Sequence, residues 1–276
     1  MVGKQTFMDT QTLEKIHKLQ IEMIKELHKY CKEHNLHYSV ICGSLLGAIR
    51  HKGIIPWDDD VDIALIREEY NELIKLLKEE PIEGLFIQDY STDPYYYQPY
   101  AKLLKENTEY IEGFRKNNKS RSGVFIDIFP LDYIKKPGMK KTKFRRTISR
   151  VITFAIWNKE NCHMEREGSK KLINAVSKII SILPKSFLIK VQNKLVIRKR
   201  KDKEYVASMF SSNYETDRLY FTVNDFETLI ELPFEDIVVN APKNWKENLT
   251  RLYKDYMVLP PKDKRNSGHD VYRVSL

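Results

Sequence analysis

The chain has 276 residues and a formal net charge of +9, with 42% hydrophobic and 31% charged residues. This length is sufficient for one large domain or two small ones, and the composition excludes an intrinsically disordered chain. There is no run of 18 or more uncharged apolar residues, which excludes a conventional membrane-spanning helix. The first residues have no apolar signal core, and the three cysteines (Cys31, Cys42, Cys162) are widely spaced. We therefore expect a cytoplasmic protein with free thiols.

Positive charge is concentrated in one segment. Residues 135–201 contain 20 Lys or Arg against three acids, a net charge of +17, so the rest of the chain carries −8. The cations alternate with aliphatic residues, which is typical of a helix lying on an anionic membrane surface. Nucleic-acid binding, which favours exposed stacking aromatics, is not expected. A helical subdomain that buries its apolar face and leaves its lysines in solvent is the alternative to contact with the inner face of the membrane.

The spacing of apolar residues predicts the secondary structure in chain order. The expected elements are a helix over 11–34, a strand over 36–42, helix 44–51, strand 60–66, helix 67–80, strands 84–90, 95–105, 109–114 and 123–132, basic helices over 138–201 divided at Pro184, strands 204–210, 218–223 and 228–242, helix 244–257 and a polar tail. This irregular alternation indicates an α+β fold with a mixed sheet flanked by helices. We expect a catalytic core over 1–134, an inserted basic helical segment over 135–202, and strands and a helix over 203–276 that complete the catalytic domain.

Four aspartates crowd into the five residues from Asp58 to Asp62. In a strand alternate side chains share a face, so Asp60 and Asp62 point the same way and offer carboxylates to a hard cation such as Mg²⁺. Asp127 is the only charged residue from Val124 to Pro130, and a carboxylate in an apolar strand is costly unless it is paired or binds a metal. If the two strands are neighbours, Asp127 completes the site. Asp58 and Asp59 lie in the preceding loop and receive a supporting role or none.

Gly43 and Ser44 lie where a predicted strand passes into a predicted helix. Backbone N–H groups at a helix N-terminus bind phosphate, and glycine allows a close approach, although Ser44 taken alone is equally typical of a helix N-cap. A phosphate site followed by paired aspartates and a third aspartate on another strand indicates metal-assisted transfer at a phosphorus atom.

The stretch GSLLGAIRHKGIIPWDDDVDIAL, residues 43–65, resembles the signature of the LicD family, a branch of the nucleotidyltransferase-like superfamily that includes fukutin-related protein. The resemblance continues in YYYQPYAKLLKENT (95–108), GVFIDIFPLD (123–132) and LPFEDIVVNAPKNWKENLTRLYKDYMVLPP (232–261). It implies a nucleotidyltransferase-like fold and transfer of a phospho-alcohol from a CDP-linked donor to a hydroxyl of a cell-surface glycan, such as teichoic acid, capsule or lipopolysaccharide. Phosphocholine from CDP-choline is the leading candidate, and glycerol- or ribitol-phosphate remain alternatives.

The resemblance also implies roles for single residues. Mg²⁺ or Mn²⁺ would be held by Asp60, Asp62 and Asp127, with Asp127 as ligand or proton acceptor. The donor phosphates would be bound by Gly43, Ser44, Arg50, His51 and Lys102. A solvent-facing lysine is an equal alternative for Lys102, and His269 is expected to be a surface histidine of the tail. The expected partners are the CDP-linked donor and a lipid-linked glycan acceptor. A nucleotidyltransferase that releases pyrophosphate from a nucleoside triphosphate is the competing interpretation, because the same motif serves both reactions.

Overall fold

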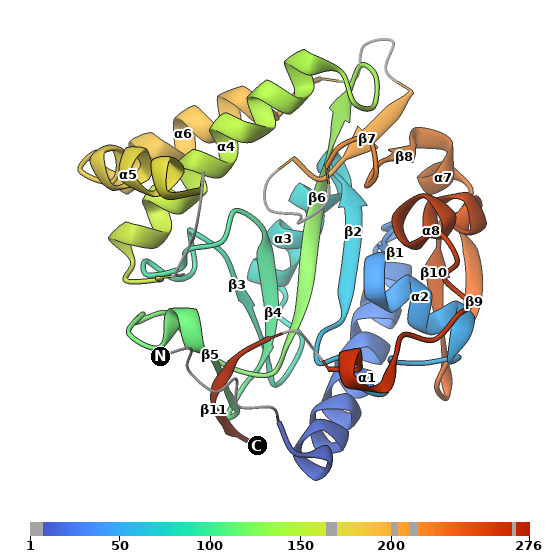
Figure 1. Ribbon diagram of the computed structural model, residues 1–276. Coiled ribbons are helices and arrows are strands. Elements are labelled where there is room, and N and C mark those ends of the chain that lie inside the picture. Colours follow the sequence, from blue (N-terminus) through green and yellow to red (C-terminus); the bar gives the residue numbers. More distant parts are fainter. Residues whose placement is uncertain (1–7, 164–169, 200–203, 210–214, 267–268) are drawn as a thin grey trace.

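The computed structural model describes residues 8–163, 170–199, 204–209, 215–266 and 269–276. A seven-stranded mixed sheet forms its centre, with the strand order β1-β2-β6-β4-β3 (Figure 1). The remaining two strands extend it, because β7 pairs with β6 and β8 pairs with β7. These strands are β1 (Ser39–Val40), β2 (Asp62–Ile66), β3 (Leu85–Gln88), β4 (Ala101–Lys105), β6 (Phe125–Ile134), β7 (Tyr205–Ala207) and β8 (Phe221–Thr222). Only β2 and β6 run parallel within it, so the predicted α+β fold with a mixed sheet is confirmed.

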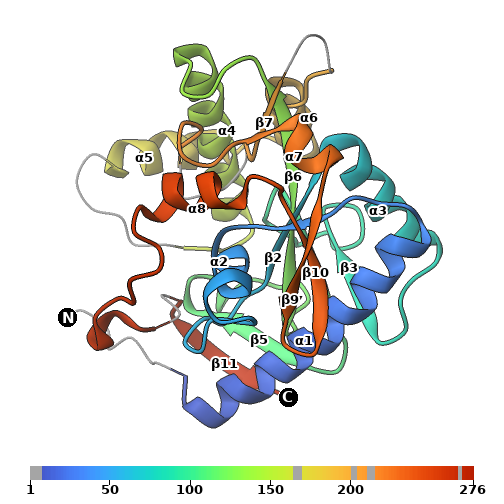
Figure 2. The same cartoon turned by 90° about the vertical axis from the view of Figure 1, so that its right-hand side faces the viewer.

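The helices cover the sheet and complete the chain. They are α1 (Thr10–Glu33), α2 (Cys42–Arg50), α3 (Arg67–Glu79), α4 (Lys140–Lys159), α5 (Lys170–Ile180), α6 (Lys185–Val196), α7 (Val223–Glu227) and α8 (Trp245–Tyr253), with short 3₁₀ helices η1 (Gly113–Arg115) and η2 (Lys262–Lys264). Figure 2 shows α1 and α3 together on one side of the sheet. None of the helices in the described ranges is both long and apolar enough to span a bilayer.

The pleat of β2 separates core from site. Ile63 and Leu65 belong to the large apolar core that α1 and α3 supply, whereas Ala64 belongs to a second apolar cluster on the opposite face. Asp62 is two residues before Ala64 in the strand, so its side chain lies on the same face, away from α1 and α3. The side chains of one strand therefore build the core and the candidate site at once.

Several predicted strands are shorter in the structure. The run 95–105 becomes a strand only at Ala101, because Pro94 and Pro99 have no N–H to donate to a ladder and the backbone N–H of Tyr95 bonds to the Asp93 carboxylate instead. The strand expected from residue 60 begins at Asp62, and that expected over 36–42 is reduced to Ser39–Val40.

The polar tail was mispredicted, since it contains a strand. β11 (Val271–Ser275) pairs antiparallel with β5 (Glu109–Glu112), and β9 (Ile230–Phe234) pairs with β10 (Ile237–Ala241). Val271 and Val274 of β11 pack against the large core, while Tyr272 and Arg273 are exposed. A register shift between Val271 and Arg273 puts the two valines three residues apart, so the sequence lacks the alternation that predicts a strand.

The basic helices pack mainly on one another. Ile152, Ala155 and Ile156 of α4 form a small apolar cluster with Leu188 of α6. The following strand β7 returns to the central sheet and pairs with the last residues of β6.

The division of the chain into a core over 1–134, an inserted segment over 135–202 and a C-terminal part over 203–276 stays a prediction.

Candidate active site

Three chemically active side chains form a row across the sheet. Asp62 of β2 is the register partner of Asp127 of β6, and Asp127 is in turn the partner of Lys102 of β4. The Lys102 ammonium lies 2.7 Å from Asp127 Oδ1, and both side chains are buried. The expectation that Asp127 lies beside Asp62 thus agrees with the register, while the solvent-facing alternative for Lys102 is wrong.

The loop before β2 holds the other carboxylates. Asp60 and Asp58 are half-buried, whereas the side chain of Asp59 is completely inaccessible to solvent. The Tyr110 hydroxyl donates a hydrogen bond to Asp59 Oδ2, and the His269 ring lies against the other oxygen, with 2.7 Å between Nδ1 and Oδ1. Asp59 is therefore a buried carboxylate with a hydrogen-bond partner at each oxygen. The assignment of His269 as a surface histidine of the tail is wrong.

Helix α1 fixes the course of this loop. The Gln20 side-chain amide donates to the Asp59 carbonyl at 2.8 Å and to the Phe125 carbonyl at 3.3 Å. The His17 ring is 2.7 Å from the Asp58 carbonyl. Because backbone groups in a buried loop need such partners, these contacts determine where the aspartate side chains lie.

Gly43 and Ser44 begin helix α2 beside the same loop. The backbone N–H of Asp62 donates to Ser44 Oγ at 2.8 Å, so the hydroxyl ties the start of β2 to the start of α2. A Cβ on Gly43 would lie 2.8 Å from Asp58 Oδ2, so glycine lets the acidic loop approach the helix end. The phosphate-binding role assigned to Gly43 and Ser44 stays a prediction.

Arg50 and His51 lie at the other end of α2. The Arg50 guanidinium donates to the Tyr256 carbonyl at 2.8 Å and lies 5.9 Å from the centre of the Trp57 ring. The His51 ring meets the same Trp57 ring edge-on, with 5.6 Å between centroids. The contacts recorded for these two side chains are with Trp57 and the C-terminal segment, and the donor-binding role assigned to them stays a prediction.

The carboxylates raise one another's affinity for protons. Burial raises the pKa of Asp60 to about 6, and the charges of Asp59 and Asp127 add to this effect. Burial and the charges of its neighbours, Asp60 first, also raise the pKa of Asp62 and of Asp58 well above the usual range. The pKa of Asp127 is raised by burial too, although the Lys102 ammonium opposes the shift. The site therefore holds more negative charge than its own cations neutralise.

His269 supplies one of those cations. Burial alone would lower its pKa, but the hydrogen bond to Asp59 and the charges of Asp59 and Asp60 raise it to about 10. The donor atoms of Asp59, Asp60 and His269 all lie within 4.8 Å of one another. When the His269 imidazole is protonated, it cannot bind a metal and forms an ion pair with Asp59.

The remaining donors suit a hard divalent cation. Asp60 and Asp62 offer carboxylate oxygens, and Asp127 lies in register beside Asp62. Carboxylates that are crowded, partly desolvated and short of positive charge are what Mg²⁺ or Mn²⁺ requires, with phosphate oxygens and water as further ligands. The residues expected to bind metal therefore fit that role in donor type and charge.

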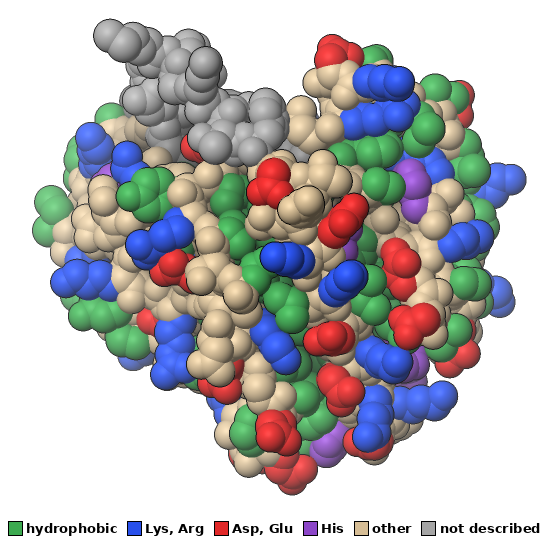
Figure 3. Space-filling model, turned by 90° about the horizontal axis from the view of Figure 1, so that it is seen from below, with side chains coloured by type: hydrophobic (Ala, Val, Ile, Leu, Met, Phe, Trp, Pro, Cys, Tyr) green, Lys and Arg blue, Asp and Glu red, His purple; other side chains and the backbone are tan. Residues whose placement is uncertain are grey.

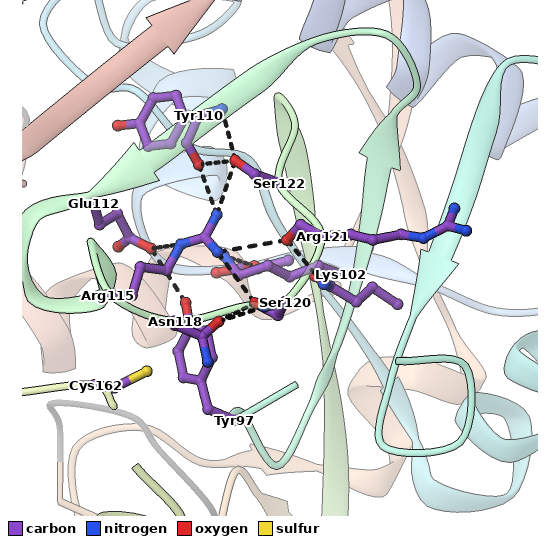
Figure 4. Close-up of polar contacts among 12 residues, drawn as sticks. Tyr97, Lys102, Tyr110, Glu112, Arg115, Asn118, Ser120, Arg121, Ser122 and Cys162 are labelled. Carbon is purple, nitrogen blue, oxygen red and sulfur yellow. Dashed lines mark hydrogen bonds and ion pairs between the residues drawn. The ribbon is translucent and has the colours of Figure 1, made fainter. Parts of the chain in front are cut away.

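A buried arginine, Arg115, is the centre of a group of polar contacts beside Tyr110 (Figure 4). Arg115 of η1 donates to the Tyr110 carbonyl at 2.7 Å and to the hydroxyls of Ser120 and Ser122, and it forms an ion pair with Glu112 at 3.7 Å. These bonds fold residues 113–122 back on β5 and so hold Tyr110 where its hydroxyl reaches Asp59. No local pattern in the sequence predicts a role for Arg115, because its partners come from a loop without periodicity.

The tyrosines near β4 differ in position. Tyr96 and Tyr97 are buried, and Tyr97 packs against Phe114 and Trp157. Tyr100 alone of these has a recorded contact with the acidic group, with its hydroxyl 3.4 Å from Asp127 Oδ2.

Part of the chain matches a known protein family. The family model described as "LicD/FKTN/FKRP, nucleotidyltransferase domain" matches residues 35–163, which include the row formed by Asp62, Asp127 and Lys102. Residues 35–163 thus carry the nucleotidyltransferase domain of the LicD family. The lipopolysaccharide cholinephosphotransferase LicD of Haemophilus influenzae is 28% identical to it over 258 residues, which cover 90% of this chain and 92% of that protein.

Two shorter similarities are to uncharacterized proteins of Rickettsia. The protein of Rickettsia prowazekii is 41% identical over 56 residues, 20% of this chain and 21% of that protein. The protein of Rickettsia typhi is 44% identical over 48 residues, 17% of this chain and 16% of that protein. The similarity to Haemophilus LicD covers 258 residues, far beyond the matched nucleotidyltransferase domain, and therefore carries more weight than the two shorter ones.

Proposed function

We propose that this chain is a metal-dependent phosphotransferase that moves a phospho-alcohol from a CDP-linked donor to a hydroxyl of a cell-surface glycan and releases CMP. Phosphocholine is the alcohol phosphate we propose first, because the Haemophilus relative named as a cholinephosphotransferase is similar over most of both chains. The observation that carries the proposal is the row formed by Asp62, Asp127 and Lys102 on adjacent strands.

Asp60, Asp62 and Asp127 are the residues we propose as metal ligands. Bound Mg²⁺ or Mn²⁺ would neutralise charge on the donor pyrophosphate and polarise its phosphorus. The crowding of these carboxylates, which raises their pKa values together with burial, supports this assignment, because a divalent cation would relieve their mutual repulsion.

The chain's own groups then orient the reactants. An acceptor hydroxyl attacks the phosphorus that bears the alcohol, a new P–O bond forms, and the bond to the bridging oxygen breaks so that CMP leaves with that oxygen. Asp127 is our candidate for the acceptor's proton, since burial raises its pKa and makes it a stronger base than an exposed aspartate. Lys102, 2.7 Å from Asp127, holds the carboxylate in place and is the cation that we propose for the phosphate oxygens.

We propose that Asp59 and His269 are positioning residues. Asp59 anchors the loop between Tyr110 and His269, so the next residue, Asp60, is held in a fixed orientation. The N-terminal N–H groups of α2 at Gly43 and Ser44 are the candidate phosphate site, because they lie beside the same loop.

The reaction is tested with purified protein, Mg²⁺, an acceptor glycan and CDP-choline, CDP-glycerol or CDP-ribitol, with CMP measured as product. We expect CMP release with one of these donors and its loss in excess chelator. If the protein instead releases pyrophosphate from CTP or ATP and leaves every CDP-alcohol intact, the nucleotidyltransferase interpretation replaces this proposal.

A further inference from the structure

The hairpin of helices α5 and α6 leaves an apolar tip exposed. Its inner face is buried, with Leu188 packed on α4. Its outer face is not, since Ile179 is 69% exposed, Ile182 81% and Phe187 50%. Val176 and Leu183 are also exposed, so these five side chains form what we call the apolar tip. The alternative in which the basic segment buries its apolar residues therefore holds for only one face of the hairpin.

The charge around the apolar tip has a single sign. Residues 168–201 contain ten Lys or Arg and no Asp or Glu. Of the three acids in 135–201, the structure describes Glu160, which is already in an ion pair with Lys185 at 3.0 Å. Elsewhere, as in the view from below, acidic side chains are interspersed with basic ones (Figure 3). A partner of the hairpin must therefore accept aliphatic side chains and supply negative charge.

We propose that the α5–α6 hairpin docks on the surface of an anionic lipid bilayer, with the apolar tip inserted among the lipids and the surrounding lysines at the headgroups. Aliphatic side chains lose contact with water by entering the acyl region, and cations beside them gain from anionic headgroups. A nucleic acid fits the tip less well, because four of its five side chains are aliphatic and only Phe187 offers a ring for a base to stack on.

The hairpin is also tied to the candidate active site. The Lys185 ammonium donates to the Pro94 carbonyl at 2.6 Å and lies 5.5 Å from the centre of the Tyr90 ring. The segment that begins at Tyr90 leads into β4, and its Tyr100 hydroxyl is 3.4 Å from Asp127. Docking of the tip would therefore hold the site at a fixed place relative to the bilayer. The docking does not depend on which reaction the site performs.

The proposal is tested by co-sedimentation of the full chain with lipid vesicles. Vesicles of phosphatidylcholine alone are compared with vesicles that also contain phosphatidylglycerol, at near-physiological salt. We expect binding to the anionic vesicles only. The triple variant Ile179→Ser, Ile182→Ser, Phe187→Ser should lose about tenfold or more in partitioning, because the apolar contribution is removed while every lysine remains.

A second variant separates charge from insertion. Replacing Lys178, Lys190 and Lys194 by Gln should also reduce binding to anionic vesicles about tenfold or more, because each exposed cation near the surface contributes. The matched control replaces three exposed lysines of α1 by Gln and should bind as the wild type does; these are Lys15, Lys18 and Lys25. Thermal unfolding of each variant checks that the chain still folds.

Three results would overturn the docking proposal. The first is no vesicle binding by the wild type, or binding that ignores anionic lipid. The second is undiminished binding by the serine triple variant, or an equal or larger loss in a control that replaces two exposed valines elsewhere, Val238→Ser with Val258→Ser. The third is tight binding of a single-stranded oligonucleotide in place of vesicles, which would assign the cations to nucleic acid.

Discussion

His269 Nδ1 lies 2.7 Å from Asp59 Oδ1, although the two residues are 210 positions apart in the chain. The contact exists because β11 pairs with β5, which also carries Tyr110, the second partner of Asp59. One short C-terminal strand therefore places His269 against the acidic loop, although the family match of this domain ends at residue 163.

The first prediction concerns this contact. Replacing His269 by Asn removes the positive charge that balances Asp59, so Asp60 should lose its fixed orientation and kcat/KM should fall about 10- to 100-fold. Asp59→Asn should have a similar effect, and the double variant should lose little more than either single one, because the residues act as a unit. Steady-state CMP release over a range of pH measures this.

A matched control lies in β11, which follows His269 directly. Arg273 forms an exposed ion pair with Glu109, and Arg273→Gln should leave kcat/KM unchanged while β11 stays paired. Wild-type activity in His269→Asn would show that the contact serves neither positioning nor charge balance.

The second prediction concerns the proposed metal ligands. Asp62→Asn should lower turnover by about a thousandfold or more, because a ligand of the metal that stabilises the transition state is lost. In chelator, however, its melting temperature should equal or exceed that of the wild type, since one of several mutually repelling, partly desolvated carboxylates has been removed. Mg²⁺ should raise the melting temperature of the wild type and not that of the variant.

The same measurement separates the two roles of Asp127. If Asp127→Asn loses turnover but is still stabilised by Mg²⁺, the residue is the base and not an essential ligand. If both are lost, it is a ligand. Full turnover in either aspartate variant would contradict the proposed metal site.

The third prediction compares two buried ion pairs on β6. Lys102→Met leaves the Asp127 carboxylate without its ion-pair partner, and we expect a loss of about 3–5 kcal/mol in the free energy of unfolding. Arg67, bonded to both oxygens of Asp132 at 2.9 and 2.7 Å, is the matched control further along the same strand. Arg67→Met should be as destabilising, measured by urea unfolding in chelator.

The two variants should differ in activity. Folded Lys102→Met protein should have lost phosphotransfer, whereas folded Arg67→Met protein should retain it, when both are assayed well below their melting temperatures. Equal activity of the two would contradict a role for Lys102 in the reaction.

The fourth prediction concerns Ser44. Ser44→Ala removes the acceptor of the Asp62 N–H, which should cost about 1–2 kcal/mol of stability and shift the Asp62 carboxylate. Ser44→Thr keeps the hydroxyl and should recover most of the activity that Ser44→Ala loses. Failure of the threonine to recover it would assign the effect to packing and not to the hydrogen bond.

Much of the site could be predicted from local sequence. The acidic run with a strand behind it, the glycine and serine before a helix, and a single aspartate in an apolar strand each have a physical meaning within a few residues. Asp62 and Asp127 were placed together by that reasoning, and the register of β2 and β6 agrees with it. The helices α1, α2 and α3 were predicted to within a few residues, because their apolar spacing is regular.

The sequence by itself determined the elements whose apolar face is buried, the mixed α+β class and the aspartates that share a site, since side-chain periodicity and charge cost are local properties. The tertiary structure alone decided three other matters: that β11 brings His269 to Asp59, that Arg115 folds the loop after β5, and that the α5–α6 hairpin buries one apolar face and exposes the other. The first and the third depend on partners distant in sequence, which no local pattern in a short strand or a half-covered helix identifies. The partners of Arg115 lie within seven residues, but in a loop that has no periodicity to predict its course.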